Sequence, residues 1–542
     1  MAECPGSKPR VVLPSLGFAA GGEPGAHRYS ATRSQPPPPP TPKTMTRPGP
    51  RVLILWAAAV ALVGAGAWSS VRADTPLQVV APAPSPDVAP AAQAPPQLAV
   101  PRGSLGTPLL PRLRSLLGLF TLTLLAWALS VHRQSVDWRV VVWGLSLQLI
   151  FAILILRTPV GEGVFFAMNG VVVALLGFTL DGARFIFGNL VLDTVPVGTG
   201  TVGQGDFTAI PGQVANTGAF FAFNVLPTII FFSSLMTVLY YLGIMQMLVK
   251  GFAWIMQRTM KTSGAETLST AGNIFVGMTE APLLIKPFVE RMTMSELMAV
   301  MTGGFATVAG GVLAAYVLML VAFFPEVAGH LMAASVMSAP AALVVAKLMH
   351  PETEVPITAG TLEIRVEKRD ANVVDAAARG ASEGLMLALN VGAMLLAFVA
   401  LIAMCNGLLA WLGGLAGWDG LSLELFLGWA LAPLAWLMGV PWIDAPEVGA
   451  LMGVKTVLNE FFAYLQLTAS VGGDQPLQPR SILIATYALS GFANFGSIAI
   501  QLGGIGGIAP SRRQDLSRLG LRAMIGGSIA AFMTACVAGM LL

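Results

Sequence analysis

Long apolar runs recur along the chain from about residue 111 to residue 542. A helix of about twenty residues crosses the hydrocarbon core of a bilayer, because it rises about 1.5 Å per residue. The runs are unbroken, unlike the alternating ten-residue strands of an outer-membrane barrel. The pattern therefore predicts spanning helices, at 116–131, 140–156, 218–249, 298–324, 331–348, 385–412, 424–440, 448–468 and 522–542.

Three stretches between these runs differ from them in composition. The stretch 163–178 is short and flanked by a charged turn, so we expect it to lie along the membrane interface. Residues 196–216 are rich in Gly and Thr and predict a polar loop. Residues 351–380 carry most of the long charged runs, which predicts a solvated loop leading into an amphipathic helix.

Residues 266–291 are apolar for most of their length but carry polar residues at their centre. Asn273, Thr279 and Glu280 surround a glycine there. Each half of this segment has about twelve residues and would reach roughly 18 Å, about half of the hydrocarbon thickness. The pattern predicts a re-entrant hairpin whose tip lies near the midplane, where only protein or a watery cavity can satisfy non-helical backbone.

A second interrupted segment lies at 481–507, where Gly491, Asn494 and Ser497 separate two apolar halves. We expect it to be the second re-entrant hairpin. Paired broken segments in the two halves of a membrane chain point to a transporter binding site. The alternative is a pair of kinked, tightly packed helices.

Each expected hairpin has an unusual neighbour. The sequence TGGFATVAGG at 302–311 is a weak helix former. It either unwinds, which would free carbonyls to bind a cation, or serves close helix packing through its small residues. The other neighbour, 452–467, places Asn459 and Glu460 inside an apolar stretch.

Composition supports the membrane assignment. The 542 residues are 55% hydrophobic and 11% charged, with a mean hydropathy of +0.72, whereas soluble domains are about one quarter charged. The net charge of +3 is too small to suggest a nucleic-acid partner. The three cysteines and four histidines are dispersed, which argues against a disulfide framework or a metal site.

The first 110 residues are not expected to fold. Residues 1–50 are rich in Pro, Gly, Arg and Ser, and 74–110 form a Pro/Ala-rich linker. Between them, 45–73 has a basic start, an apolar core and a small-residue cleavage site, which predicts a secretory signal peptide. The alternative for this segment is a first transmembrane helix.

The candidate chemistry centres on two carboxylates, Glu280 and Glu460. A charge at membrane depth costs several kcal/mol unless it is paired, hydrated or protonated, so these residues suggest function. Hydroxyl, amide and aromatic side chains accompany them: Asn273, Thr279, Phe492, Asn494, Phe495 and Ser497. The set suits a small, largely uncharged ligand with several hydroxyls and a flat ring. No phosphate-binding loop of the G-x-x-x-x-G-K-[ST] type is present, so an ion gradient would drive transport.

Five motifs in order resemble the concentrative nucleoside transporter family over roughly 111–542: GNIFVGMTEAPLLIKP, MTGGFATVAGGVLAAYV, GVKTVLNEFFAY, TYALSGFANFGSIAIQLGG and APSRRQDLSRLGLRAMIGGSIAAFMTACVAGML. The resemblance implies an all-α polytopic homotrimer with inverted repeats. Each protomer would have about eight transmembrane helices, two re-entrant hairpins and interfacial helices.

The resemblance also implies a scaffold domain and a mobile transport domain. We expect scaffold and trimerisation helices at 111–250 and a scaffold helix with its connection at 385–440. The two halves of the transport domain are then expected at 251–384 and 441–542.

By the same resemblance, the candidate substrate residues are Met278, Thr279, Glu280, Val312, Glu460, Phe492, Asn494 and Ser497. The family uses the positions of Glu460, Asn494 and Ser497 for the ribose. It uses the first hairpin tip for the base, with Glu280 acting partly through water and Val312 lining the base pocket. The implied Na⁺ site comprises Asn273, Val276, Thr307 and Val308.

One position departs from the family pattern. Well-studied relatives carry Gln where this chain has Met278, and a thioether offers a base edge little hydrogen bonding. We therefore predict a looser or purine-tolerant pocket.

The expected function is Na⁺-driven nucleoside import across a bacterial inner membrane, by alternating access and with no cofactor besides the coupling ion. The expected partners are nucleosides, the lipid bilayer and two further copies of the chain, with no nucleic acid. The alternatives are H⁺ coupling, since two buried carboxylates could carry a proton, and another small hydroxylated solute. A channel and a binding protein also remain open. An enzyme is not expected, because no His lies near either glutamate motif.

Overall fold

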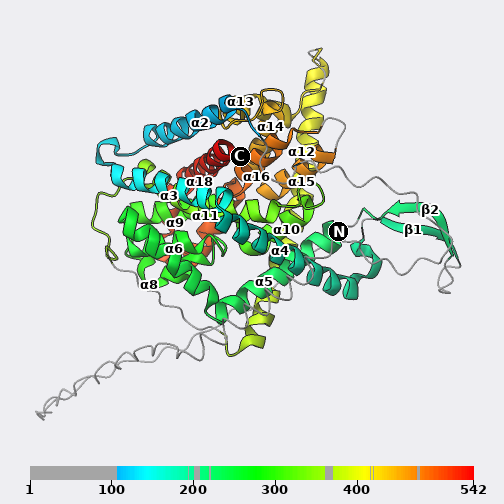
Figure 1. Cartoon of the computed structure of the whole chain (residues 1–542), viewed down its shortest axis with the longest axis horizontal. Helices are drawn as coiled ribbons and strands as arrows, with labels where there is room; N and C mark the ends of the chain where they lie inside the picture. Colours follow the sequence, from blue (N-terminus) through cyan, green and yellow to red (C-terminus); the bar gives the residue numbers. More distant parts are fainter. Residues whose placement is uncertain are drawn as a thin grey trace, which may run out of the picture. The chain divides into compact units, whose positions relative to one another are not determined.

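The computed structural model describes residue 100 and residues 106–192, 194–200, 208–218, 221–360, 370–415, 417–418, 420–472 and 476–542. The predicted signal peptide at 45–73 lies outside these residues. The described part is helical, with one two-stranded sheet (Figure 1).

The helices before the middle of the chain are α2 (Leu109–Ala128), η1 (Arg133–Ser135), α3 (Trp138–Arg157), α4 (Pro159–Phe187), η2 (Gly188–Val191), η3 (Phe221–Val225), α5 (Leu226–Tyr241), α6 (Ile244–Met260), α7 (Gly264–Gly272), η4 (Ala281–Ile285), α8 (Lys286–Val289), α9 (Met294–Ala306), α10 (Gly310–Leu320) and α11 (Val327–Met349). Those that follow are α12 (Val373–Leu415), α13 (Leu423–Leu437), α14 (Ala445–Val457), α15 (Glu460–Gly472), α16 (Pro479–Leu489), α17 (Phe495–Ile508), η5 (Pro510–Arg512) and α18 (Arg513–Leu541).

Local sequence explains where several of these helices begin. Ser263 and Glu266 form a reciprocal capping box at the start of α7, and Thr293 and Glu296 form another at the start of α9. Thr158 caps α4, whose first residue is a proline with no N–H to satisfy. These caps fix the ends of the elements that carry the candidate site.

Eight helical segments among the described residues are long and apolar enough to cross a membrane, as predicted: Leu109–Ala128, Trp138–Arg157, Pro159–Val191, Phe221–Tyr241, Met294–Leu320, Val327–Met349, Val373–Leu415 and Pro510–Leu541. Three expected spans were wrong in detail. The run 218–249 turns at Gly243, which has φ +83° and separates α5 from α6. The run 424–440 forms the 15-residue α13, and 448–468 is divided between α14 and α15.

Two other stretches also differ from expectation. Residues 163–178 are not a short separate stretch, because they are part of the 29-residue α4, which is also long and apolar enough to span a membrane; that they lie along the membrane interface stays a prediction. Residues 196–216 are not a plain loop, because β1 (Thr194–Thr199) and β2 (Thr208–Asn216) pair antiparallel. The register of this hairpin shifts between Pro196 and Gly198. The Gly and Pro content of these strands hid them in the sequence, since both residues are depleted in strands.

Four interrupted elements bring non-helical backbone into the middle of the fold. In the first half, η4 folds back against α7 within the segment 266–291, where the sequence predicts a hairpin. Next to it, α9 and α10 are separated at 307–309, so the weak helix at 302–311 does unwind.

The second hairpin is not where the sequence predicted it. Helices α14 and α15 pack against each other across a two-residue break, whereas α16 and α17 make little or no contact with each other. The hairpin of the second half is therefore residues 445–472, and 481–507 belongs to a broken helix. Glu460 begins the second arm of that hairpin, next to the break.

This assignment makes the two halves correspond. Each has a hairpin with a Thr-Glu or Asn-Glu pair at its turn and a broken helix with a related sequence, GFAT at 304–307 and GFAN at 491–494. The same order of elements supports the inverted-repeat architecture.

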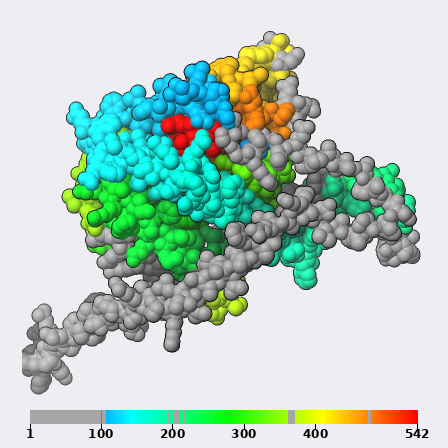
Figure 2. All heavy atoms as spheres, in the orientation of Figure 1, coloured from blue at the N-terminus to red at the C-terminus, as the bar shows by residue number. Residues whose placement is uncertain are grey.

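Burial separates a central group of helices from a peripheral group. In an apolar stretch of 18 residues in α11, 94% of the residues are buried, whereas the corresponding buried share is 22% in α12 and 17% in α4 with η2. Helices α2 and α3 pack against α11 and α18, while α12 pairs with α5. Figure 2 shows the C-terminal end of the chain, in red, surrounded by residues near the start of the described chain, in blue and cyan. The broken elements carrying the candidate residues pack against this central group.

Candidate substrate and cation site

Glu460 is the best-connected candidate residue. Its carboxylate is buried and accepts two hydrogen bonds, one from the Tyr316 hydroxyl (3.0 Å) and one from Asn494 Nδ2 (2.9 Å). These partners come from α10 and from the break before α17, so three elements distant in sequence meet at one carboxylate. A buried carboxylate with neutral donors retains acceptor capacity for a ligand hydroxyl.

Asn494 is held in two directions. Its Nδ2 donates to Glu460, and its Oδ1 accepts from the backbone N–H of Ser497 (2.8 Å), which makes Asn494 the N-cap of α17. Asn494 and Ser497 are both buried, as is Phe492 in the break. The structure therefore brings together Glu460, Asn494 and Ser497, the three residues expected to contact a ribose. Phe495 points elsewhere, because 52% of it is exposed.

The two helix breaks also touch each other. Gly491 has φ +125°, and a Cβ there would lie about 3 Å from the backbone of Phe305 and Ala306, immediately before Thr307. On the other side of that break, the N–H of Gly310 donates to the carbonyl of Phe275 in the first hairpin (3.1 Å). A continuous series of contacts thus links the second hairpin to the first.

The tip of the first hairpin packs against the buried face of α17. Gln501 Nε2 lies 3.7 Å from Met278 Sδ, and a Cβ at Gly504 would come within 2.9 Å of Thr279 Cγ2. Ser497 and Gln501 are four residues apart and so lie on the same face of this helix. Met278 and Thr279 therefore lie about one to two helical turns from Ser497.

Glu280 behaves differently from Glu460. It is exposed, and its Oε2 accepts only from the N–H of Gly277 (3.3 Å) among the described residues. No hydrogen bond joins it to Glu460 within the described part of the chain. Val312 is buried one turn before Tyr316 on the same face of α10.

The cation candidates lie beside the first break. Asn273 ends α7, and its Nδ2 donates to the carbonyl of Ser269 (3.1 Å), while its buried Oδ1 has no hydrogen-bond partner among the described residues. Thr307 ends α9, and its hydroxyl donates to the carbonyl of Gly303 (2.9 Å). Val276 and Val308 are buried nearby in the sequence. An unpartnered amide oxygen fits a hard cation, which prefers oxygen ligands.

Three residues at the site were not predicted from the sequence. Tyr316 donates to Glu460, Tyr464 stacks on Tyr316 with ring centroids 4.4 Å apart, and Lys455 is fully buried with its Nζ donating to the carbonyl of Ala488 (2.9 Å). The two tyrosines could have been found from the sequence as polar hydroxyls within apolar helices, because a buried Tyr hydroxyl usually needs a hydrogen-bond partner.

A buried ion network holds the base of the first hairpin. Lys347 Nζ lies 2.7 Å from Glu266 and 3.1 Å from Glu352, and it donates to the Ser295 hydroxyl. The Ser263 hydroxyl donates to Glu296 in the same network (2.5 Å). The network ties the starts of α7 and α9 to the end of α11, away from the hairpin tip.

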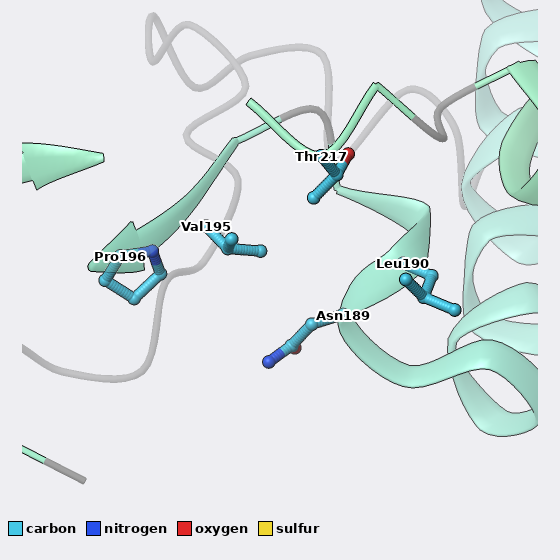
Figure 3. A pocket seen from close by; sticks show the side chains of 5 residues that line it. All are labelled: Asn189, Leu190, Val195, Pro196 and Thr217. Atoms are coloured by element: carbon cyan, nitrogen blue, oxygen red, sulfur yellow. The ribbon is translucent and has the colours of Figure 1, made fainter. Parts of the chain in front are cut away.

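A surface hollow lies outside this site. It has a volume of about 390 Å³ and lies between η2 and the start of β1, where Figure 3 shows its lining residues Asn189, Leu190, Val195, Pro196 and Thr217. None of the candidate substrate or cation residues lines it.

Comparison with known families gives a consistent result. Residues 330–539 match the C-terminus of the Na⁺ dependent nucleoside transporters, 117–190 match their N-terminus, and 222–323 match the Gate family of nucleoside recognition. The hagfish Eptatretus stoutii protein "Solute carrier family 28 member 3" is 43% identical over 437 residues, which cover 78% of this chain and 60% of that protein. This chain thus spans about three fifths of the length of that relative.

Smaller relatives are covered almost completely. An uncharacterized transporter of Haemophilus influenzae is 43% identical over 431 residues, which cover 79% of this chain and 97% of the relative. The solved structure of CNTnw in an inward-facing substrate-bound state is 42% identical, with a TM-score of 0.70, and the match covers 79% of this chain and 97% of CNTnw. A CNTnw variant in an outward-facing state is also 42% identical, with a TM-score of 0.71, and the match covers 80% of this chain and 98% of that chain. The chain therefore belongs to the concentrative nucleoside transporter family.

Proposed function

We propose that this protein is a secondary active symporter that imports nucleosides together with Na⁺ across a bacterial inner membrane. The observation that carries the proposal is the Glu460–Asn494 hydrogen bond, with Tyr316 on the same carboxylate. It joins a hairpin turn, a helix break and α10 at one polar point inside an apolar body. Asn494 also caps α17, but a buried carboxylate in an apolar body is costly, and that cost favours a role for this point in binding a ligand.

The ribose would bind at this point. Its hydroxyls can donate to Glu460 and exchange hydrogen bonds with Asn494 and Ser497, whose donors and acceptors suit a polyol. The base would extend toward Met278 and Thr279, with Phe492 and Val312 supplying apolar surface. Glu280, at the exposed end, would act on the base through water.

The coupling ion would bind next to the base end. Asn273 Oδ1 lacks a hydrogen-bond partner in the part of the chain that the structure describes, and the backbone around Thr307 is not helical. These oxygens, with the backbone of Val276 and Val308, would hold Na⁺, and the ion would supply positive charge that draws the hairpin tip and the break together. The relatives are described as transporters, and their description fits this architecture. We therefore propose no cofactor besides the coupling ion and no enzymatic activity.

Transport would occur by movement of a body that contains the whole site. The sequence placed 111–250 in the scaffold, but α2 and α3 pack against α11 and α18. We therefore assign α2 and α3 to the mobile body and α4, α5 and α12 to the scaffold. The exposed apolar faces of α4 and α12 fit lipid and two further copies of the chain in a homotrimer.

Paired cysteines test this division. Gly311 on α10 lies against Ser233 on α5, while Gly526 on α18 lies against Thr302 on α9. In a cysteine-free background, oxidation of the Gly311→Cys/Ser233→Cys pair is expected to stop uptake, and reduction to restore it. The Thr302→Cys/Gly526→Cys pair is the control within one body and should be insensitive to oxidation. Equal effects on both pairs would refute the division.

Uptake into proteoliposomes tests the function itself. Purified protein should accumulate labelled adenosine and uridine against a concentration gradient when Na⁺ is higher outside than inside. Accumulation without Na⁺ but with a proton gradient would identify a proton symporter. Equilibration without accumulation would identify a channel, and binding without uptake would identify a receptor.

A further inference from the structure

Gln501 occupies a position between the two halves of the site. It is fully buried on α17, one turn after Ser497. Its Nε2 donates to the backbone carbonyl of Met301 on α9 (3.1 Å) and lies 3.7 Å from Met278 Sδ. One amide therefore contacts the first hairpin tip and the helix that ends at the cation candidate Thr307.

The packing around this amide leaves little freedom. A Cβ on Gly304 would lie 2.8 Å from Gln501 Nε2 and 2.8 Å from Met278 Cβ. Met278 and Gln501 are thus pressed side by side onto α9, at a position that holds only a glycine. The Met278 side chain is therefore in direct contact with Gln501.

The amide is also incompletely satisfied. Gln501 Oε1 is buried and accepts no hydrogen bond from any residue that the structure describes, although a buried acceptor without a partner lowers stability. The donor to Met301 fixes which end of the amide is the oxygen.

We propose that Gln501 is a positioning residue for base selectivity, and that the Met278–Gln501 pair, acting as a unit, sets the preference between purine and pyrimidine nucleosides. Met278 contacts the base and Gln501 fixes its side chain from behind. The inference rests on the proposed nucleoside site and adds a residue of the second half of the chain to base recognition.

The test measures the ratio of Vmax/KM for adenosine to that for uridine in proteoliposomes. Gln501→Met keeps an unbranched side chain of similar length but removes the amide. It is expected to change this ratio at least about fivefold, through KM, with Vmax kept within about twofold. Met278→Leu should move the ratio in the same direction, and the double variant should change it no more than the larger single change, because the two residues act as a unit.

Gln148 provides a matched control. It is also fully buried, its Nε2 donates to one hydroxyl, that of Thr534 (3.1 Å), and its Oε1 has no partner. Gln148→Met should cost similar stability but leave the selectivity ratio within about twofold. If Gln501→Met does not yield folded protein, Gly304→Ala displaces the pair sterically and should change the ratio in the same way.

Equal changes in KM for both nucleosides, a change confined to Vmax, or additive effects in the double variant would each overturn the inference. These outcomes all require uptake by the unchanged protein. Failure of the unchanged protein to take up either nucleoside would instead refute the proposed function, so the two failures are distinguishable.

Discussion

Replacing Glu460 by Gln tests the central contact of the site with the smallest change of shape. The two carboxylate oxygens accept from Tyr316 (3.0 Å) and from Asn494 (2.9 Å). A Gln side chain has only one acceptor oxygen and no charge. If its NH₂ group faces Tyr316, the hydroxyl can turn and accept from it, but both hydrogen bonds lose their charged acceptor. If it faces Asn494, that amide has to turn over, and its Oδ1 then no longer caps α17 through Ser497.

The size of the effect follows from these contacts. A hydrogen bond to a charged group contributes about 1.5–3 kcal/mol, and an N-cap contributes about 1 kcal/mol. Loss of both takes about 2.5–4 kcal/mol of favourable interaction or pre-organisation from the site. At about 1.4 kcal/mol for each factor of ten, nucleoside affinity should fall roughly 60- to 700-fold.

The assay is direct binding of adenosine to purified protein, followed by uptake in proteoliposomes. Glu424→Gln is the matched control, because Glu424 accepts from Asn406 Nδ2 (2.9 Å) and Asn406 Oδ1 accepts from a backbone N–H, but both lie away from the site. This control should bind and transport adenosine normally. Normal uptake by Glu460→Gln would show that the carboxylate does not contact the substrate, and equal loss in both variants would show a general defect of folding.

Other predictions address the ion, the base and the fold. Exchange of external Na⁺ for choline at constant pH should abolish adenosine uptake, and uptake that persists in choline would refute Na⁺ coupling. Asn273→Ala should raise the half-saturating Na⁺ concentration about tenfold, because it removes one contact with the energy of a hydrogen bond. Met278→Gln should improve uptake of uridine and cytidine relative to adenosine and inosine, because it restores an amide at the base, and strict pyrimidine selectivity of the unchanged protein would contradict this reasoning. Lys347→Met should lower the free energy of unfolding by about 3–5 kcal/mol, because it leaves Glu266 buried without its cation. Arg518→Ala, at an exposed ion pair, should change this free energy by less than about 0.5 kcal/mol. Thermal denaturation followed by size-exclusion chromatography would compare the two variants.

The first hairpin could be predicted from the sequence because its signal is local. Polar residues at 273–280 lie between two apolar halves, each too short to cross a membrane, and a glycine and a proline accompany them. The unwinding at Thr307 has a similarly local cause, since Gly and Thr are weak helix formers. Such features depend on neighbouring residues alone and so remain visible without a structure.

The second hairpin was misplaced because the same local pattern has two solutions. A polar interruption between apolar halves produces either a hairpin, in which the halves pack together, or a broken helix, in which they do not. Only tertiary contacts separate the two, and they place the hairpin at 445–472 and the broken helix at 479–508. The related GFAT and GFAN sequences offered a clue, because they pair the break at Thr307 with the break at Asn494.

Contacts between distant parts of the chain explain the rest of the site. Tyr316 and Glu460 are 144 residues apart, and Met278 and Gln501 are 223 residues apart, so no spacing in the sequence links them. These contacts also bear on how the protein would work. Each joins an element of the first half to one of the second, and all of them lie within the proposed mobile body. A movement of that body past α4, α5 and α12 would therefore carry the site across the membrane without taking it apart, because none of the hydrogen bonds that form it extends to the scaffold.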